Sequence, residues 1–134
     1  MNLSNMKTDL ADTGAIMQVM YDGTYDPIKG MTVTLKGTDS AFYRKGKLKK
    51  EQAIIDRQIN SKGKAKIDAE KLYEDSIEDL ATMTVSWSGF EEDGKPIECT
   101  AKNAARVYEE YSFIKEQVQA FVNERDNFRS KGKK

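Results

Sequence analysis

Residues 112–128, SFIKEQVQAFVNERDNF, form the clearest amphipathic pattern in the chain. The apolar residues of this segment recur at steps of three and four, which places them on one stripe of a helix. Charged and amide side chains fall mostly on the other side. We therefore expect one helix over 112–128, with Ser112 as its N-cap. Its stripe must pack against the body of its own domain or against a neighbouring subunit. The stripe comprises Phe113, Ile114, Val118, Phe121, Val122 and Phe128.

A chain of 134 residues has the size of one small domain. Hydrophobic residues make up 38% of it and charged residues 33%, enough for one modest core under a highly charged surface. No apolar run approaches the roughly 20 residues that a membrane span needs. The polar start, MNLSNMKTDLADT, lacks the apolar region of a secretion signal, so we expect a cytoplasmic location.

The chain has one cysteine, Cys99, and no histidine. The first fact excludes an internal disulfide framework. The second removes the usual general base, the commonest zinc ligand and every Ser-His or Cys-His nucleophile. Cys99 itself is expected to be a small buried residue without special activation. We predict no enzymatic activity, no catalytic residue, no cofactor and no metal site.

Charge is distributed in blocks although the total is 22 basic against 22 acidic residues. Residues 1–66 hold 12 basic and 7 acidic side chains, residues 67–128 hold 6 and 15, and residues 129–134 hold 4 and none. This order suits head-to-tail contact between copies or an oppositely charged partner. Opposite blocks that face each other within one fold would give the same pattern.

The first half of the chain predicts a β-hairpin. Residues 15–21 are mostly apolar, and residues 31–36 alternate with Met31, Val33 and Leu35 on one face. Between them, DGTYDPIKG contains Asp-Gly, Pro27 and Gly30, which favour turns. Because an isolated hairpin is marginal in water, we expect helices to cover its apolar face. Residues 1–14 are expected to form a flexible N-terminus.

A helix is predicted from about Ala41, preceded by the N-cap candidates Thr38, Asp39 and Ser40. Gly46 could bend or break it. This helix carries a basic patch, interpreted either as a solvated face or as a contact for an acidic partner or a neighbouring copy. The apolar stripe comprises Ala41, Leu48, Ile55 and Ile59, and the patch comprises Arg44, Lys45, Lys47, Lys49 and Lys50.

A second helix is predicted over 69–83 with Leu72, Ile77 and Leu80 on its inner face. Its acidic side chains lack the glycine-hinged spacing of a calcium-binding loop, so a cation site is not favoured. As an oppositely charged surface, they are candidates for binding the basic patch of another copy. The acidic candidates are Glu74, Asp75, Glu78 and Asp79.

Residues 84–100 contain Trp87 and Phe90 before a loop with Asp93-Gly94. We interpret the two aromatic residues as part of the core, with a binding platform as the alternative. A third helix is predicted over 101–111 with Thr100 as its cap, and residues 129–134 are expected to be a basic disordered tail.

Two stretches of the chain carry a family resemblance, WSGFEEDGKPIECTAKNAARVYEEYSFIKEQVQAFVNERDNF at 87–128 and GTDSAFYR at 37–44. They resemble the tail assembly chaperones of long-tailed (siphovirus-type) bacteriophages and prophages. The short helix is similar to the family pattern N-A-x-x-[LV]-Y, and the last helix to [IV]-x-x-Q-V-x-x-[FA]-[VI]-x-x-R-x-N-F. Upstream, GTDSAFYR at 37–44 resembles the family's entry into its first helix, G-x-D-S-x-x-[FY]-R. The family also has a Trp-containing helix end before the loop. The matching residues are Gly37, Asp39, Ser40, Tyr43, Arg44, Trp87, Asn103, Ala104, Val107, Tyr108, Ile114, Gln117, Val118, Phe121, Val122, Arg125, Asn127 and Phe128.

The resemblance implies a non-enzymatic morphogenesis factor that coats the tape-measure protein while the tail tube polymerises, with the tail tube protein as a further partner. It implies work in the host bacterial cytoplasm and absence from the mature virion. A longer product made by ribosomal frameshifting is also implied by the family. Two other functions remain open, namely a tail or head–tail connector protein and a small nucleic-acid-binding regulator, which the neutral charge balance does not favour.

Taken together, the sequence predicts an α+β fold of mainly helical content, with a hairpin over 15–36 packed on about four helices in one domain over 15–128. We expect weak head-to-tail self-association that salt loosens, with charges giving orientation and apolar residues giving affinity. The apolar candidates for protein binding are Phe113, Val118 and Phe121.

Overall fold

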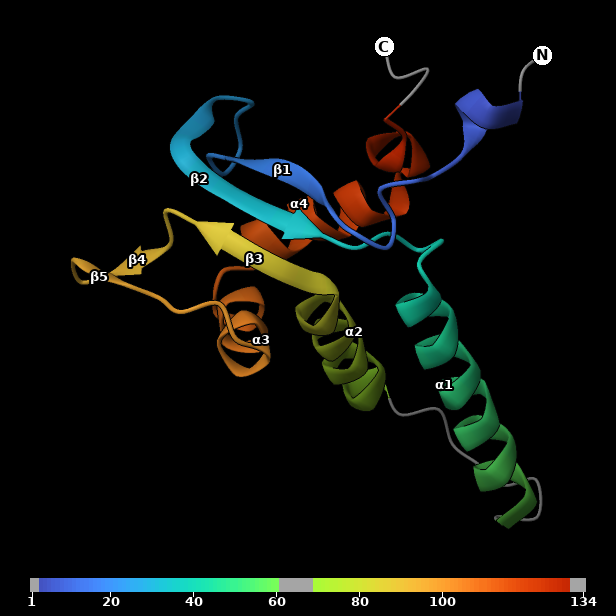
Figure 1. Ribbon diagram of the computed structural model, residues 1–134. Coiled ribbons are helices and arrows are strands. Elements are labelled where there is room, and N and C mark those ends of the chain that lie inside the picture. The colour runs from blue at the N-terminus through green and yellow to red at the C-terminus, as the bar shows by residue number, and fades with distance from the viewer. Residues whose placement is uncertain (1–2, 61–68, 131–134) are drawn as a thin grey trace.

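The computed structural model describes residues 3–60 and 69–130 (Figure 1). Its α+β, mainly helical architecture with an N-terminal hairpin confirms the expected fold class. The last expected helix is divided into α4 and η2. In chain order the elements are η1 (Leu3–Met6), β1 (Ala15–Met20), β2 (Pro27–Leu35), α1 (Ala41–Asn60), α2 (Ala69–Met83), β3 (Thr84–Ser88), β4 (Glu91–Glu92), β5 (Lys95–Pro96), α3 (Ala101–Glu110), α4 (Ser112–Asn123) and η2 (Arg125–Phe128).

The predicted hairpin is the larger part of a three-stranded antiparallel sheet with the order β1-β2-β3. Val33 lies at its centre, opposite Met17 on β1 and Trp87 on β3. The expectation that Trp87 ends a helix is therefore wrong. β-Branched and aromatic residues in TVSWS favour a strand, and β2 offers that strand a free edge.

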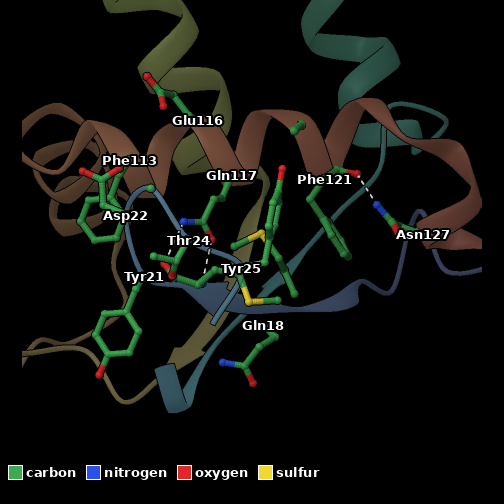
Figure 2. A pocket seen from close by; sticks show the side chains of 14 residues that line it. Gln18, Tyr21, Asp22, Thr24, Tyr25, Phe113, Glu116, Gln117, Phe121 and Asn127 are labelled. Carbon is green, nitrogen blue, oxygen red and sulfur yellow. Dashed lines mark hydrogen bonds between the residues drawn. The ribbon is translucent and has the colours of Figure 1, made fainter. Parts of the chain in front are cut away.

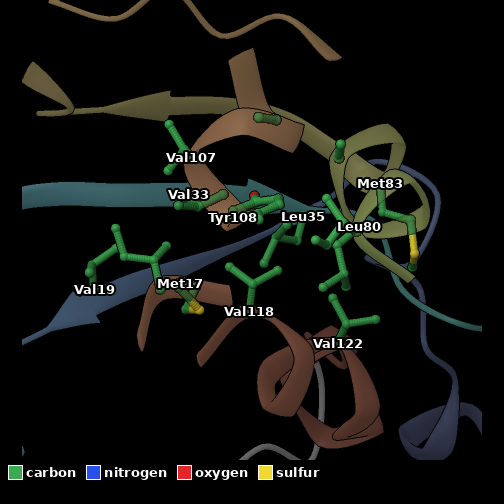
Figure 3. Packing of buried hydrophobic residues seen from close by; sticks show 14 of the residues in the cluster. Met17, Val19, Val33, Leu35, Leu80, Met83, Val107, Tyr108, Val118 and Val122 are labelled. Atoms are coloured by element: carbon green, nitrogen blue, oxygen red, sulfur yellow. The ribbon is translucent and has the colours of Figure 1, made fainter. Parts of the chain in front are cut away.

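Helices α2, α3 and α4 cover the sheet and enclose the main core (Figure 3). Met17, Val19, Val33 and Leu35 point into it from the sheet, so the alternation read in the sequence is correct. Each of the three helices contributes buried residues to this core. They include Leu80 and Met83 of α2, Val107 and Tyr108 of α3, and Val118 and Val122 of α4.

Helix α4 does not extend to Phe128 as the sequence predicted. It ends at Asn123, Glu124 adopts an extended conformation, and the short helix η2 follows. The side chain of Asn127 donates a 3.0 Å hydrogen bond to the carbonyl oxygen of Phe121, which stabilises the turn. Ser112 is the first helical residue and not the cap, a position that Tyr111 occupies without a side-chain hydrogen bond.

Phe128 lies in a second, smaller core with Ala11 and Ala15. Phe121 joins the two cores, since it packs against both and its ring meets that of Phe128 edge to face at 5.5 Å. The expected flexible N-terminus thus includes a packed part, because Ala11 is buried and Gly37 donates a hydrogen bond to its carbonyl oxygen. Of the expected tail, residues 131–134 lie outside the described residues.

Helix α1 projects away from the sheet, while the two ends of the described chain lie close together (Figure 1). It begins where predicted, with the hydroxyl of Ser40 accepting a hydrogen bond from the N–H of Tyr43, and it passes through Gly46 without a break. However, its predicted apolar stripe is not buried: Leu48 is 65% exposed and Ile55 is 48% exposed. The side chain of Ile59 lies outside the described residues.

Candidate functional site

The basic patch of α1 and the acidic residues of α2 are partly engaged with each other. The ammonium group of Lys50 lies 2.5 Å from the carboxylate of Asp79 and also donates to the carbonyl oxygen of Asp75. The charge pattern had left this intramolecular pairing open as one alternative. Because both side chains of the ion pair are more than two-fifths exposed, the pair contributes little to stability, typically below about 1 kcal/mol.

The rest of the patch faces solvent. Lys45, Lys47 and Lys49 are exposed, as are Glu74 and Glu78 on α2. Arg44 is exposed as well and donates to the carbonyl oxygen of Asp39. These side chains remain accessible to a partner in the described structure.

A small cleft of about 210 Å³ separates α1 from α2. Its apolar lining comes from Phe42, Ile54 and Met83, and Lys50 and Asp79 are also among its lining residues. With Phe42 and Ile54 more than two-fifths exposed, this side of α1 is also incompletely covered.

The three apolar candidates of α4 have different environments. Val118 is fully buried in the main core, so it is not accessible to a partner. Phe113 and Phe121 are partly buried, and both line an open cavity beside α4.

This cavity, called the α4 groove here, is an open depression of about 620 Å³ between the β1–β2 loop and α4. Figure 2 shows Phe113, Gln117 and Phe121 pointing from α4 toward the loop. The lining residues are Met17, Gln18, Met20, Tyr21, Asp22, Gly23, Thr24, Tyr25, Phe113, Glu116, Gln117, Ala120, Phe121 and Asn127.

Gln117 fixes the base of the groove. Its amide oxygen accepts from the N–H of Met20 at 2.8 Å, and its amide nitrogen donates to the carbonyl oxygen of the same residue at 2.9 Å. Both bonds tie α4 to the outer strand of the sheet. They also occupy the N–H and the carbonyl group of Met20, which would otherwise be open to another strand.

Tyr21 and Tyr25 form the loop side of the groove, and sequence reasoning missed them. Tyr25 is 96% exposed and Tyr21 is 56% exposed. The loop is held by a 2.9 Å hydrogen bond from the N–H of Tyr21 to the carbonyl oxygen of Asp26, and Gly23 supplies a positive φ of 75°. Two tyrosines flanking an Asp-Gly turn are the signal that could have identified this surface.

Both charged residues among those lining the groove are acidic. Asp22 comes from the loop and Glu116 from α4, and both are exposed. The neighbouring Lys115 lies over the ring of Tyr73, with 5.1 Å between its nitrogen and the ring centroid. The groove therefore combines an apolar, aromatic lining with negative charge.

A polar cluster joins the β4–β5 hairpin to α3. The guanidinium of Arg106 binds both carboxylate oxygens of Glu92 at 2.8 and 3.2 Å, and the hydroxyl of Tyr111 donates to the same carboxylate at 2.7 Å. These bonds, from Arg106 first and Tyr111 second, lower the pKa of Glu92. They hold the β4–β5 hairpin against α3.

Cys99 and the acidic side chains are the remaining candidates for chemistry in the described residues. Cys99 is half-buried and not fully buried as expected, and this burial raises the pKa of its thiol. Within residues 3–60 and 69–130, no three Cys, Asp or Glu side chains are grouped so that they could hold a metal ion. No helix in the same residues has the length and apolar character needed to cross a membrane.

Comparison of the chain with models of protein families, with curated proteins and with solved structures gives no match.

Proposed function

We propose that the chain is a non-enzymatic tail assembly chaperone of a long-tailed bacteriophage or prophage, acting on the tape-measure protein in the host cytoplasm. The proposal rests on the resemblance of two separate stretches, 37–44 and 87–128, to this family, although Trp87 lies in strand β3 and not at a helix end. In this account the protein binds and shields its partner during tube assembly and is absent from the finished particle.

The observation that carries the proposal is that these two stretches meet in the structure. The carboxylate of Asp39 lies 3.3 Å from the guanidinium of Arg125. A Cβ atom at Gly37 would lie 3.0 Å from the ring of Phe128, so a larger residue would displace that ring. Residues that match the family in distant parts of the sequence thus depend on one another, which supports the view that they belong to one inherited fold.

Other residues that match the family patterns form hydrogen bonds from their side chains to backbone groups. The side-chain amide of Gln117 bonds to the N–H and the carbonyl oxygen of Met20, and that of Asn127 donates to the carbonyl oxygen of Phe121. All three bonds are partly buried. Side-chain amides that satisfy buried or partly buried backbone groups are costly to replace. Their match to the pattern therefore supports a shared fold more strongly than an equal number of exposed matches would.

The exposed surface of α1 supports a binding role. Leu48 and Ile55 are seven residues apart, on the same side of the helix, and both face solvent. Basic side chains accompany them, while α2 carries exposed acidic side chains. In the proposed mechanism, this stripe contacts a neighbouring copy in a head-to-tail manner, and Lys47 and Lys49 orient it.

The proposed function is tested by co-expression with the tape-measure protein encoded in the same genome. We expect affinity-tagged chain to retain the tape-measure protein and to keep it soluble, and we expect mass spectrometry of purified virions to lack this chain. Retention of neither the tape-measure nor the tail tube protein would contradict the proposal, as would stoichiometric presence in the virion. A connector protein would be present in the virion in stoichiometric amounts.

A further inference from the structure

We propose that the α4 groove binds an amphipathic helix that presents apolar side chains between basic residues. This inference deepens the proposed function by naming the surface and the chemical class of its partner. It rests on the shape and charge of the groove, and its test does not use the tape-measure protein.

The lining of the groove fits apolar side chains. Phe113 and Phe121 form its α4 side, Met17 and Met20 come from β1, and Tyr21 and Tyr25 come from the loop. Methionine and aromatic side chains together form adaptable surfaces that accept apolar groups of varied shape. A volume of about 620 Å³ in an open depression accommodates several side chains of one segment.

The backbone geometry favours a helix over a strand as the partner. A strand would bind by adding to the edge of the sheet at β1. At Met20, however, both the N–H and the carbonyl group are already bonded to the side chain of Gln117. A partner that contacts the chain at Met20 therefore binds through its side chains, as an amphipathic helix does in a groove. Ala120, small and exposed on α4, leaves room for such a helix to approach.

The negative charge of the α4 groove favours basic residues in the partner helix. Asp22 on the loop and Glu116 on α4 are both exposed, and both are among the residues that line the groove. The described lining contains no Lys or Arg. Lysine or arginine residues beside the apolar anchors would meet both carboxylates, whereas acidic residues would be repelled by them.

The test uses two designed helical peptides with the same leucine anchors at positions i, i+3, i+4 and i+7. One peptide has lysines beside the anchors and the other has glutamates. Binding to the isotope-labelled chain is followed by backbone amide shifts. We expect the lysine peptide to shift the signals of residues 20–25 and 113–121, and the glutamate peptide to bind at least about tenfold more weakly.

Variants then assign the effect to the groove. Ala120→Leu should block the groove and reduce the affinity for the lysine peptide at least about tenfold. Tyr25→Ala should weaken peptide binding without altering the fold, because Tyr25 is 96% exposed. The pair Asp22→Lys and Glu116→Lys should reverse the preference between the two peptides. Glu109→Lys, at an exposed site on α3, is the matched charge control and should change neither affinity.

Several outcomes would overturn the inference. They are equal binding of the two peptides, shifts confined to α1, the absence of shifts at millimolar peptide, and insensitivity to Ala120→Leu. Shifts of the groove signals that depend on the concentration of the chain alone would identify a second copy as the occupant and would also overturn it. None of these outcomes depends on capture of the tape-measure protein, so this inference and the proposed function can fail separately.

Discussion

Helices α4 and α1 both carry apolar residues at helical spacing, but these residues are buried in α4 and exposed in α1. In α4 the stripe of Ile114, Val118 and Val122 is buried against the sheet. In α1 Leu48 and Ile55 face solvent, and no described side chain of that helix is buried. An apolar stripe thus predicts a partner surface but does not say whether it belongs to the same chain.

The largest difference should appear in stability after truncation. Phe128→Ala should cost about 3 to 5 kcal/mol, because it removes a ring that fills the small core. Leu48→Ala should stay within about 0.5 kcal/mol, because that side chain is 65% exposed. Urea unfolding of both variants measures the two values. Similar costs at the two sites would show that α1 is packed in solution.

Alkaline pH should lower the free energy of unfolding through the titration of Tyr108. Burial raises the pKa of Tyr108 to about 12, compared with an ordinary value of about 10. Since the folded state holds this proton more tightly, its contribution is complete below about pH 10 and is lost as the pH rises through 12. The expected loss is about 2 to 3 kcal/mol.

Tyr108→Phe is the control for this titration. Thr84 donates its hydroxyl proton to the carbonyl oxygen of Leu80 at 2.8 Å, so its oxygen accepts from Tyr108 at 2.6 Å. Phenylalanine would forfeit that bond, about 1 kcal/mol. The variant should nevertheless lose less stability than the parent between pH 10 and 12, and an identical loss would contradict the assignment.

Removal of the exposed stripe should affect association and not folding. Leu48→Ser with Ile55→Ser should leave the free energy of unfolding nearly unchanged but weaken self-association by at least about tenfold, equivalent to about 1.4 kcal/mol. Sedimentation at several concentrations and salt levels measures this effect. A strict monomer at every concentration of the parent would exclude this part of the mechanism.

The smallest effect is expected from charge. Reversing Lys47, Lys49 and Lys50 to glutamate should weaken self-association moderately, and the loss of the Lys50–Asp79 pair should cost below about 1 kcal/mol in stability. Reversal of Lys47 and Lys49 alone separates the two effects, because it leaves that pair in place. Unchanged association in both variants would mean that charge does not guide the contact.

The sequence predicted most of the fold because its local signals agree with its packing. Alternation at Met31, Val33 and Leu35 gave the strand and its inner face, and Thr100 capped α3 as expected, with its oxygen accepting from the N–H of Asn103. By contrast, β3 was missed because TVSWS is short and follows α2 directly. Its identity depends on pairing with β2, a contact that the local sequence does not contain.

The candidate site could be predicted only in part. Phe113 and Phe121 were found because they lie on a regular stripe, yet Val118 on the same stripe is buried. Tyr21 and Tyr25 were missed because a turn sequence carries no periodic signal. The ion pair between Lys50 and Asp79 could not be predicted, because the order of charges along the chain does not say how close α1 lies to α2.

Hydrogen exchange of the backbone amides, measured segment by segment at low and high concentration of the chain, tests the contrast between α1 and α4 most directly. We expect α4 to be strongly protected at every concentration, because its stripe is part of the core. Helix α1 should exchange much faster at low concentration and gain protection around Leu48 and Ile55 as concentration rises. Equal protection of the two helices at low concentration, or exchange of α1 that does not respond to concentration, would contradict the account.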